Sequence, residues 1–273
     1  MAAKQARCFS GRAMNFTTEN IQVFKQIFQF IKKKNIKKTV LLCGPKYFSF
    51  HFRGHYHRVN MKIDVDMRIL KDYECKSPLQ FGLNSEYMTK IMRSSSDKVM
   101  KWVIDNQLIV SMPNKISNDI HEINNELHIW PTPIWLPNEC KIFEIGNDDH
   151  PIIFSLNNKY YRKKINDVKR ICTSIAVTQY TKYRSLELNY YKKSDKIISK
   201  TVFTDATKIQ LHSKIKDIFE AEFDINDMEQ LTNLFDDKKC ITFHVSEKDN
   251  MIAIVNCKHF TFTGSVSPIQ ENI

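Results

Sequence analysis

The sequence predicts an α+β protein built from two similar halves, with helices packed on one face of antiparallel sheets. Three observations predict this fold: an internal repeat, a majority of strand-like segments, and amphipathic helices that recur in both halves. Each half is expected to contain a strand, a helix and several strands, followed by the same series again. With 42% hydrophobic residues, the chain has enough apolar side chains for buried cores in both halves.

Two pairs of segments recur at nearly the same spacing. Phe16 and Phe154 each open a helical stretch that a strand-like run follows, and they lie 138 residues apart. Residues 81–84 and 223–226 each begin with phenylalanine, end with asparagine and precede a short helix, and they lie 142 residues apart. Similar offsets for two different pairs indicate a duplicated unit of about 140 residues.

Most of the remaining chain reads as strand, because its runs alternate apolar and polar side chains or are rich in β-branched and aromatic residues. The two short helices, at 85–93 and 226–235, are each followed by two such runs. The predicted strands are 39–43, 47–52, 56–65, 99–104 and 107–112 in the first half and 173–177, 184–191, 196–203, 240–245 and 251–256 in the second.

A proline-rich segment separates the halves. Residues 130–137 read Trp-Pro-Thr-Pro-Ile-Trp-Leu-Pro, and prolines at this density cannot continue a helix or a central strand. We therefore expect an extended connector here. The predicted organisation is a flexible basic N-terminal tail at 1–13, domain 1 at 14–128, an interdomain connecting loop at 129–150 and domain 2 at 151–273.

The predicted helices carry an apolar face and a basic face when projected at the helical period of about 3.6 residues. In the helix 158–172, Tyr161 and Ile165 lie on the apolar side, opposite the cations. Helices 19–34 and 85–93 repeat this pattern, whereas 226–235 shows Gln230, Asn233 and Glu229 instead. The candidate DNA-binding residues are Lys25, Lys33, Lys90, Arg93, Lys159, Arg162, Lys163 and Arg170.

Each charged face alone could be an ordinary solvated helix surface. Three helices from two repeats, none with a balancing acidic stripe, favour a surface for phosphates. The net charge of +11 also favours an anionic partner, most often nucleic acid. Because lysine and arginine contact phosphates without reading bases, and no major-groove recognition motif occurs, we expect contact with double-stranded DNA irrespective of its sequence.

Composition restricts the compartment. The seven cysteines lie at wide spacings without a CxxC pair, so free thiols in a reducing, intracellular compartment are expected. No apolar run approaches the roughly 20 residues that span a bilayer, so no membrane association is expected. The first 13 residues lack the apolar core of a signal peptide.

Catalysis is not expected, since the GxxxxGKS/T, GxGxxG, HExxH and GxSxG patterns are all missing from the sequence. His51, His55 and His57 could share one side of a strand and bind a metal ion. No carboxylate or cysteine lies beside them, however, and the pairs Asp64/Asp66 and Asp148/Asp149 are of a kind common in turns. The sequence predicts no catalytic residue, no metal and no cofactor.

The order of these elements resembles a sliding clamp of the proliferating cell nuclear antigen (PCNA) type, over about residues 15–269. Residues 80–92 resemble the family's strand and second helix, and residues 219–255 resemble its last helix and the strands that follow. The resemblance implies two tandem copies of a sliding-clamp domain with sheets outside and four helices on the inner face. It also implies a homotrimeric ring that acts as a polymerase processivity factor, in the nucleus or at a cytoplasmic viral replication site.

The resemblance further implies that the connector forms a docking groove for DNA polymerase and other proteins that carry a clamp-binding peptide. His55 lies where the family has a partner-contacting histidine. The alternative is that the tryptophans only pin the connector to the core. The residues expected to line the groove are Phe52, His55, Ile129, Trp130, Ile134, Trp135, Leu136, Pro268 and Ile269.

In such a ring, edge strands of neighbouring chains pair head to tail, here around residues 101–112 of one chain and 168–191 of the next. The basic overall charge and the weakly charged fourth helix depart from the usual acidic family subunit. They resemble divergent clamps of large DNA viruses, which include rings, dimers and monomers. The alternatives are a clamp-like viral late transcription factor, a checkpoint clamp and a nucleic-acid-binding protein that forms no ring.

Overall fold

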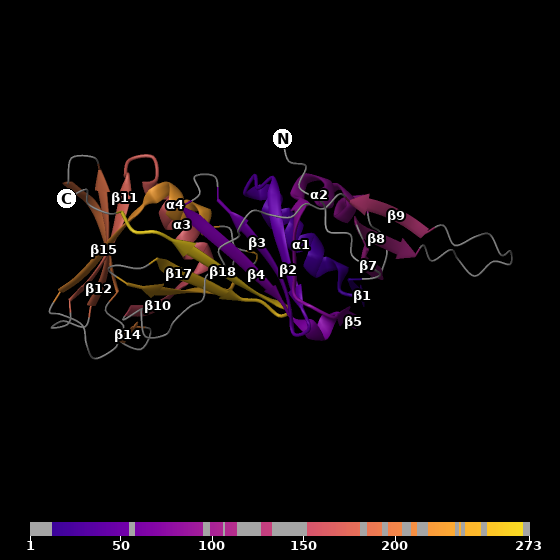
Figure 1. Cartoon of the computed structure of the whole chain (residues 1–273). Helices are drawn as coiled ribbons and strands as arrows, with labels where there is room; N and C mark the ends of the chain where they lie inside the picture. Colours follow the sequence, from indigo (N-terminus) through magenta and orange to yellow (C-terminus); the bar gives the residue numbers. More distant parts are fainter. Residues whose placement is uncertain are drawn as a thin grey trace, which may run out of the picture. The chain divides into compact units, whose positions relative to one another are not determined.

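A computed structural model of the chain is shown in Figure 1. The chain divides into two compact units. The first unit consists of Met1–Phe52, Lys62–Lys141 and Lys258–Thr261. The second unit consists of Arg53–Met61, Ile142–Cys257 and Phe262–Ile273. The structure describes residues 13–54, 58–94, 99–105, 107–113, 127–132, 152–180, 185–192, 196–203, 209–211, 218–232, 235, 238–246 and 250–269.

In the described part of the chain, strands and two α-helices make up each half (Figure 1). The first half contains β1 (Met14–Thr18), α1 (Ile21–Lys33), β2 (Lys38–Gly44), β3 (Tyr47–Arg53), β4 (Val59–Val65), a 3-10 turn (Met67–Ile69), β5 (Lys71–Cys75), β6 (Leu79–Asn84), α2 (Ser85–Ser94), β7 (Met100–Asp105), β8 (Gln107–Pro113) and β9 (Leu127–Thr132). The second half contains β10 (Ile152–Asn157), α3 (Asn158–Val168), β11 (Ser174–Tyr180), β12 (Ser185–Lys192), β13 (Lys196–Phe203), β14 (Ile209–Leu211), β15 (Ile218–Asp224), α4 (Ile225–Gln230), β16 (Cys240–Val245), β17 (Met251–Asn256) and β18 (Phe260–Val266).

The strand order is the same in the two halves. The first half has the orders β5-β1-β7-β8-β9 and β6-β2-β3-β4, and the second has β14-β10-β16-β17-β18 and β15-β11-β12-β13. Equivalent strands pair in the same antiparallel sense, as in Met14 with Ile104 of β7 and Ile152 with Val245 of β16. The predicted α+β fold with a duplicated unit is therefore confirmed.

Aromatic side chains fill the core of the first unit. Trp102 is fully buried, and its ring stacks on Phe16 with 5.5 Å between ring centroids. Phe48 and Phe50 meet edge to face at 5.4 Å, and α1 buries Phe24 beside them. Offset and edge-to-face packing of large rings buries much apolar surface in few residues, so this cluster fixes α1 on its sheet.

The helices pack in pairs, one pair in each half. The N–H of Ser85 at the start of α2 donates to the carbonyl of Lys37 (3.1 Å), and the N–H of Ile225 at the start of α4 donates to Thr173 (3.0 Å). Figure 1 shows α3 beside α4, where the Tyr161 hydroxyl donates to the Met228 carbonyl at 2.8 Å. In each half, an equivalent backbone hydrogen bond therefore joins the start of the second helix to the segment that follows the first helix.

Two helices are shorter than predicted. α4 ends at Gln230 and not at residue 235, and Phe235 has φ of 50°, a left-handed conformation that no right-handed helix contains. α3 ends at Val168 instead of residue 172, and residues 169–171 form a turn in which Ile171 N donates to Val168 O. Apolar spacing alone does not separate the last turn of a helix from the turn that follows it.

Part of the predicted connector is a strand. Residues 129–132 belong to β9, which among the described strands pairs with β8 alone and forms the end of its sheet. Pro131 is compatible with this place because an edge strand has one row of N–H groups that need no partner. Residues 133–150 lie outside the described part of the chain.

The strands that we expected to join neighbouring chains lie inside their sheets. β8 lies between β7 and β9, and β11 lies between β15 and β12. Their N–H and carbonyl groups are used within the chain, so the predicted pairing of residues 101–112 with 168–191 is wrong. β9 and β13 are the strands at the ends of these two sheets.

Candidate nucleic-acid interface

α3 carries the densest group of predicted phosphate contacts. The Asn157 side chain caps the helix by accepting a hydrogen bond from Tyr160 N at 3.2 Å. Tyr161, Ile165 and Val168 are buried on one side of the helix. On the outer side, Lys159, Lys163 and Arg170 are exposed and Arg162 is half-buried. The helical period places Lys159, Arg162 and Lys163 on one continuous surface, and Arg170 follows in the turn after the helix.

α1 and α2 present the corresponding cations of the first half. Lys33, Lys90 and Arg93 are exposed, and Lys25 is half-buried. Lys90 Nζ lies 3.3 Å from Glu86 Oε1, one helical turn earlier. Because both side chains of this pair are largely exposed, the attraction is weak and a phosphate can compete for Lys90.

A cationic cavity lies between the end of α1 and the start of α2. Its volume is about 270 Å³, and Glu86 is the one acidic residue among its described lining residues. Four lysine or arginine side chains surround it, so it attracts anions. Lys32 and Lys37 were missed by our sequence reasoning, which considered only helix faces; the dense lysines at 32–38 were the available signal. The lining residues are Lys32, Asn35, Ile36, Lys37, Ser85, Glu86, Thr89, Lys90 and Arg93.

The fourth helix adds no cation to this surface. α4 contains Asp227 and Glu229 but no basic residue. Glu229 Oε1 accepts a hydrogen bond from Lys169 Nζ at 2.6 Å, which links α4 to the turn after α3. Lys238 and Lys239 follow the helix and are exposed. The positive surface of the second half is therefore made chiefly by α3.

The residues predicted to line the partner groove are not brought together among the described residues. Phe52 is only 4% exposed and packs on Phe30, 6.0 Å away between ring centroids. It therefore belongs to the core of the described structure, and its assignment to the groove stays a prediction. Ile269 is 39% exposed and donates its N–H to Glu222 O (2.8 Å), and Pro268 beside it is half-buried.

The other groove candidates have no described side chain. Ile129 and Trp130 are described only as backbone of β9, and His55, Ile134, Trp135 and Leu136 lie outside the described residues. Their partner-binding role stays a prediction.

The histidine cluster offers no described metal site. His51 is 2% exposed, and its Nε2 lies 3.1 Å from Ser49 Oγ. Burial, together with the positive charge of Lys62, lowers the pKa of His51 to about 4, so this side chain is neutral near pH 7. His57, like His55, lies outside the described residues. Within the described part of the chain, no three histidine, cysteine or acidic residues are grouped as metal ligands would be, and no helix is long and apolar enough to cross a membrane.

Two copies of a unit with paired helices and this strand order have the fold of a DNA sliding clamp of the PCNA type. Solved structures that match nearly the whole chain confirm this fold. PCNA from Entamoeba histolytica is 12% identical, with a TM-score of 0.69 over 95% of this chain and 100% of that one. PCNA from Thermococcus kodakaraensis is 11% identical, with a TM-score of 0.71 over 94% and 100%.

A third similar structure is that of A. fulgidus PCNA with the C-terminal region of FEN-1 bound. It is 11% identical, with a TM-score of 0.68 over 95% of this chain and 100% of that one. No family model matches the chain, and no curated protein matches it by sequence. At these identities the comparison shows the fold, and the function is argued below from the surfaces of this chain.

Proposed function

We propose that this chain is a DNA sliding clamp, which encircles duplex DNA irrespective of sequence and tethers DNA polymerase and other replication proteins. The observation that carries the proposal is the basic outer face of α1, α2 and α3, repeated over two copies of the clamp domain. As such a clamp, the protein is a scaffold and not an enzyme, and it acts where DNA is replicated, in a nucleus or at a viral replication site.

The charge distribution supports a sliding contact. Exposed lysine and arginine side chains reach phosphates, which are the same at every base pair, and binding is then driven largely by release of counterions. Contacts of this kind hold the protein near the duplex without fixing its position along it. Base-specific side-chain contacts would fix the position, and the predicted set consists of lysines and arginines that track the backbone.

For ring closure, we propose that β9 of one chain pairs with β13 of the next, with three chains joined head to tail. Both strands lie at an end of their sheets. β13 carries Ile197 and Val202, which are 50% and 42% exposed, and Ile171 after α3 is 50% exposed. Exposed apolar side chains along a sheet edge are typical of a surface that another chain covers.

α3 contacts β12, the neighbour of β13 in the sheet, on one face of that sheet. Lys164 Nζ lies over the ring of Tyr190 in β12, 5.1 Å from its centroid, and Tyr190 pairs with Ser199 of β13. Tyr160, in the first turn of α3, is 45% exposed. Ile197 pairs with Tyr191 and Val202 with Glu187, so both side chains lie on the face of the sheet opposite to Tyr190. The neighbouring chain is expected to cover the edge of β13 and these two side chains.

We expect Ile197→Glu to convert a trimer into monomers, because a buried unpaired charge at the joint costs several kcal/mol. Analytical ultracentrifugation measures this directly. Tyr47→Glu is the matched control, since Tyr47 is 42% exposed in the first half of the chain and is not part of either edge. A wild-type protein that is monomeric at every concentration, or an Ile197→Glu protein that stays trimeric, contradicts this joint.

Primer extension by the cognate polymerase tests the proposed function as a whole. With this protein added, each binding event of the polymerase is expected to give longer products on a long template. Unchanged product length, together with intact duplex binding, would favour the alternative roles in transcription or in binding without a ring.

A further inference from the structure

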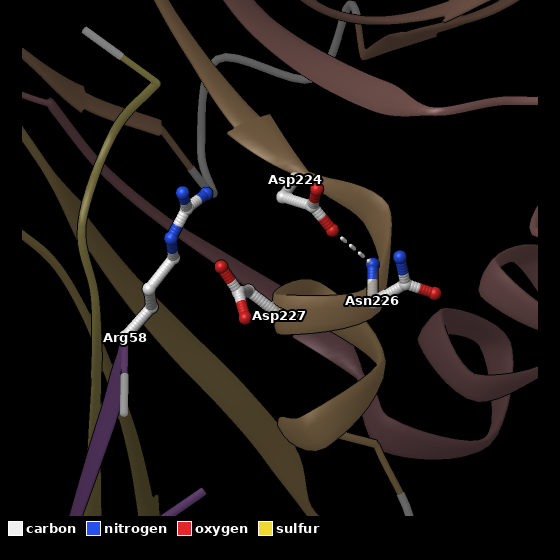
Figure 2. Close-up of a pocket in the computed structure, with 4 residues that line it drawn as sticks. All are labelled: Arg58, Asp224, Asn226 and Asp227. Atoms are coloured by element: carbon white, nitrogen blue, oxygen red, sulfur yellow. Dashed lines mark hydrogen bonds between the residues drawn. The ribbon is translucent and has the colours of Figure 1, made fainter. Parts of the chain in front are cut away.

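A second cavity lies at the start of α4, apart from the basic helix faces. Its volume is about 340 Å³, and it is lined by Arg58, Asp224, Asn226 and Asp227 (Figure 2). Arg58 precedes β4, Asp224 ends β15, and the other two residues lie in the first turn of α4. All four belong to the second compact unit.

Asp227 is the unusual member of this group. The residue is 2% exposed, and Figure 2 shows its carboxylate directed into the cavity on the side of Arg58. Among the described residues, none donates a hydrogen bond to this carboxylate or forms an ion pair with it. Asp224 differs, because its Oδ1 accepts a hydrogen bond from Asn226 N at 2.8 Å and so caps α4. Buried polar groups normally have hydrogen-bond partners, so the Asp227 carboxylate is left to pair with solvent or with a ligand in the cavity.

The charges around the cavity indicate which kind of ligand could pair with the Asp227 carboxylate. Two carboxylates face one guanidinium, so the cavity is locally acidic on a chain of net charge +11. Phosphates are repelled from such a place, which excludes it from the DNA surface. Burial and the negative charge of Asp224 raise the pKa of Asp227, while the positive charge of Arg58 acts in the opposite direction. A cation that enters the cavity would stabilise the ionised form.

A bare divalent ion fits this group poorly. Calcium takes about six to eight oxygen ligands, and magnesium about six, whereas the described lining residues offer two carboxylates and place a guanidinium beside them. The cavity is also far larger than the roughly 10–15 Å³ that a single water needs. A long side chain with a terminal cation fits both the volume and the charge.

We propose that this cavity binds a lysine or arginine side chain from a basic segment of a partner protein. The Asp227 and Asp224 carboxylates accept hydrogen bonds from the cation, and Arg58 donates a hydrogen bond to a main-chain carbonyl of the same segment. Hydrogen bonds between charged groups are among the strongest in proteins. The site contains none of the predicted DNA-binding residues, so it goes beyond the proposed clamp function and does not depend on it.

The test uses acetyl-arginine-methylamide as the probe and the neutral acetyl-citrulline-methylamide as its near-isosteric control, with the full chain labelled at its aspartate carboxyl carbons. The arginine probe is expected to shift the Asp227 carboxyl signal and to lower the pKa of that group. Asp227→Asn should weaken probe binding, measured by calorimetry, at least about tenfold. The matched control is Asp167→Asn, an exposed aspartate of α3, which should bind the probe as the wild type does.

Three results would overturn the proposal. The citrulline probe could bind as well as the arginine probe, the arginine probe could leave the Asp227 signal unchanged, or Asp227→Asn could bind the probe normally. If magnesium chloride shifts the Asp227 signal and the arginine probe does not, the cavity is a metal site and the proposal is wrong. None of these results depends on whether the protein binds DNA.

Asp227→Asn is also expected to raise the melting temperature near pH 7. Because the pKa of Asp227 is raised in the folded state, folding favours its protonated form. Its favourable contribution to stability is therefore present at acidic pH and is lost as pH rises through the folded pKa. The advantage of the variant should shrink below that range. A variant that melts below the wild type at pH 7 would show that the carboxylate has a stabilising partner within the chain.

Discussion

Reversing the charges of Arg162 and Lys163 together, as Arg162→Glu with Lys163→Glu, is expected to weaken binding to duplex DNA by about tenfold or more at low salt. Lys163 lies on the face of α3 opposite the buried Tyr161 and Ile165, and Arg162 lies beside it and is half-buried. If each contacts one phosphate, the slope of log K against log salt should fall by about two. Preference between duplex sequences should not change, because phosphates carry no sequence information.

The control for this experiment changes the net charge by the same amount elsewhere. Lys46 and Lys76 are exposed in loops of the first half, outside the four helices, so Lys46→Glu with Lys76→Glu should leave the salt slope nearly unchanged. Arg162 is half-buried, so the melting temperature of the first variant must be measured alongside its affinity. Normal duplex affinity at low salt in a folded Arg162/Lys163 variant would remove α3 from the DNA surface.

Replacing Ile134 and Trp135 by alanine is expected to abolish stimulation of the polymerase while leaving the fold, the ring and duplex binding intact. These residues lie outside the described part of the chain, and the prediction rests on two tryptophans five residues apart among prolines. Tryptophan is enriched among the residues that dominate binding energy. Truncating such a residue costs about 2 kcal/mol or more, which is roughly thirtyfold in affinity for a clamp-binding peptide.

The competing explanation for these tryptophans makes the opposite forecast. If they only pin the connector to the core, the double variant should lose thermal stability and keep its peptide affinity. Melting temperature and peptide affinity, measured on the same protein, separate the two. Trp130 is not a suitable second probe, because it lies in β9 and its replacement would also disturb pairing with β8.

The duplication and the longer elements could be predicted from sequence because they depend on local periodicity. β13, β16 and β17 have the predicted bounds, and α1 begins at Ile21 and ends at Lys33, close to the predicted range of 19–34. The short strands β1 and β10, which precede the first helix of each half, were not placed. β1 contains only Met14–Thr18, and its neighbour β7 begins at Met100, so long-range pairing rather than local pattern makes it a strand.

The same distinction applies to the two candidate surfaces. Helix faces follow the 3.6-residue period, so the cations of α3 could be placed correctly from sequence alone. The lining of the partner groove could not be predicted in this way. The central residues of β3 are all buried, so both faces of this strand are covered. Apolar spacing alone therefore gave no means to recognise Phe52 as a core residue. The cavity at Asp227 joins Arg58 to residues more than 160 positions later, and no local pattern connects them.

Retention of the protein on a linear duplex with blocked ends tests the clamp proposal most directly. The protein is allowed to thread onto a long linear duplex from its free ends, which are then blocked with biotin and streptavidin, and the complex is washed at high salt. High salt removes binding that depends only on phosphate contacts. A ring should stay on the blocked duplex and leave it when a restriction enzyme cuts the DNA. Release by salt alone, at the same rate before and after cutting, would contradict a clamp that encircles DNA.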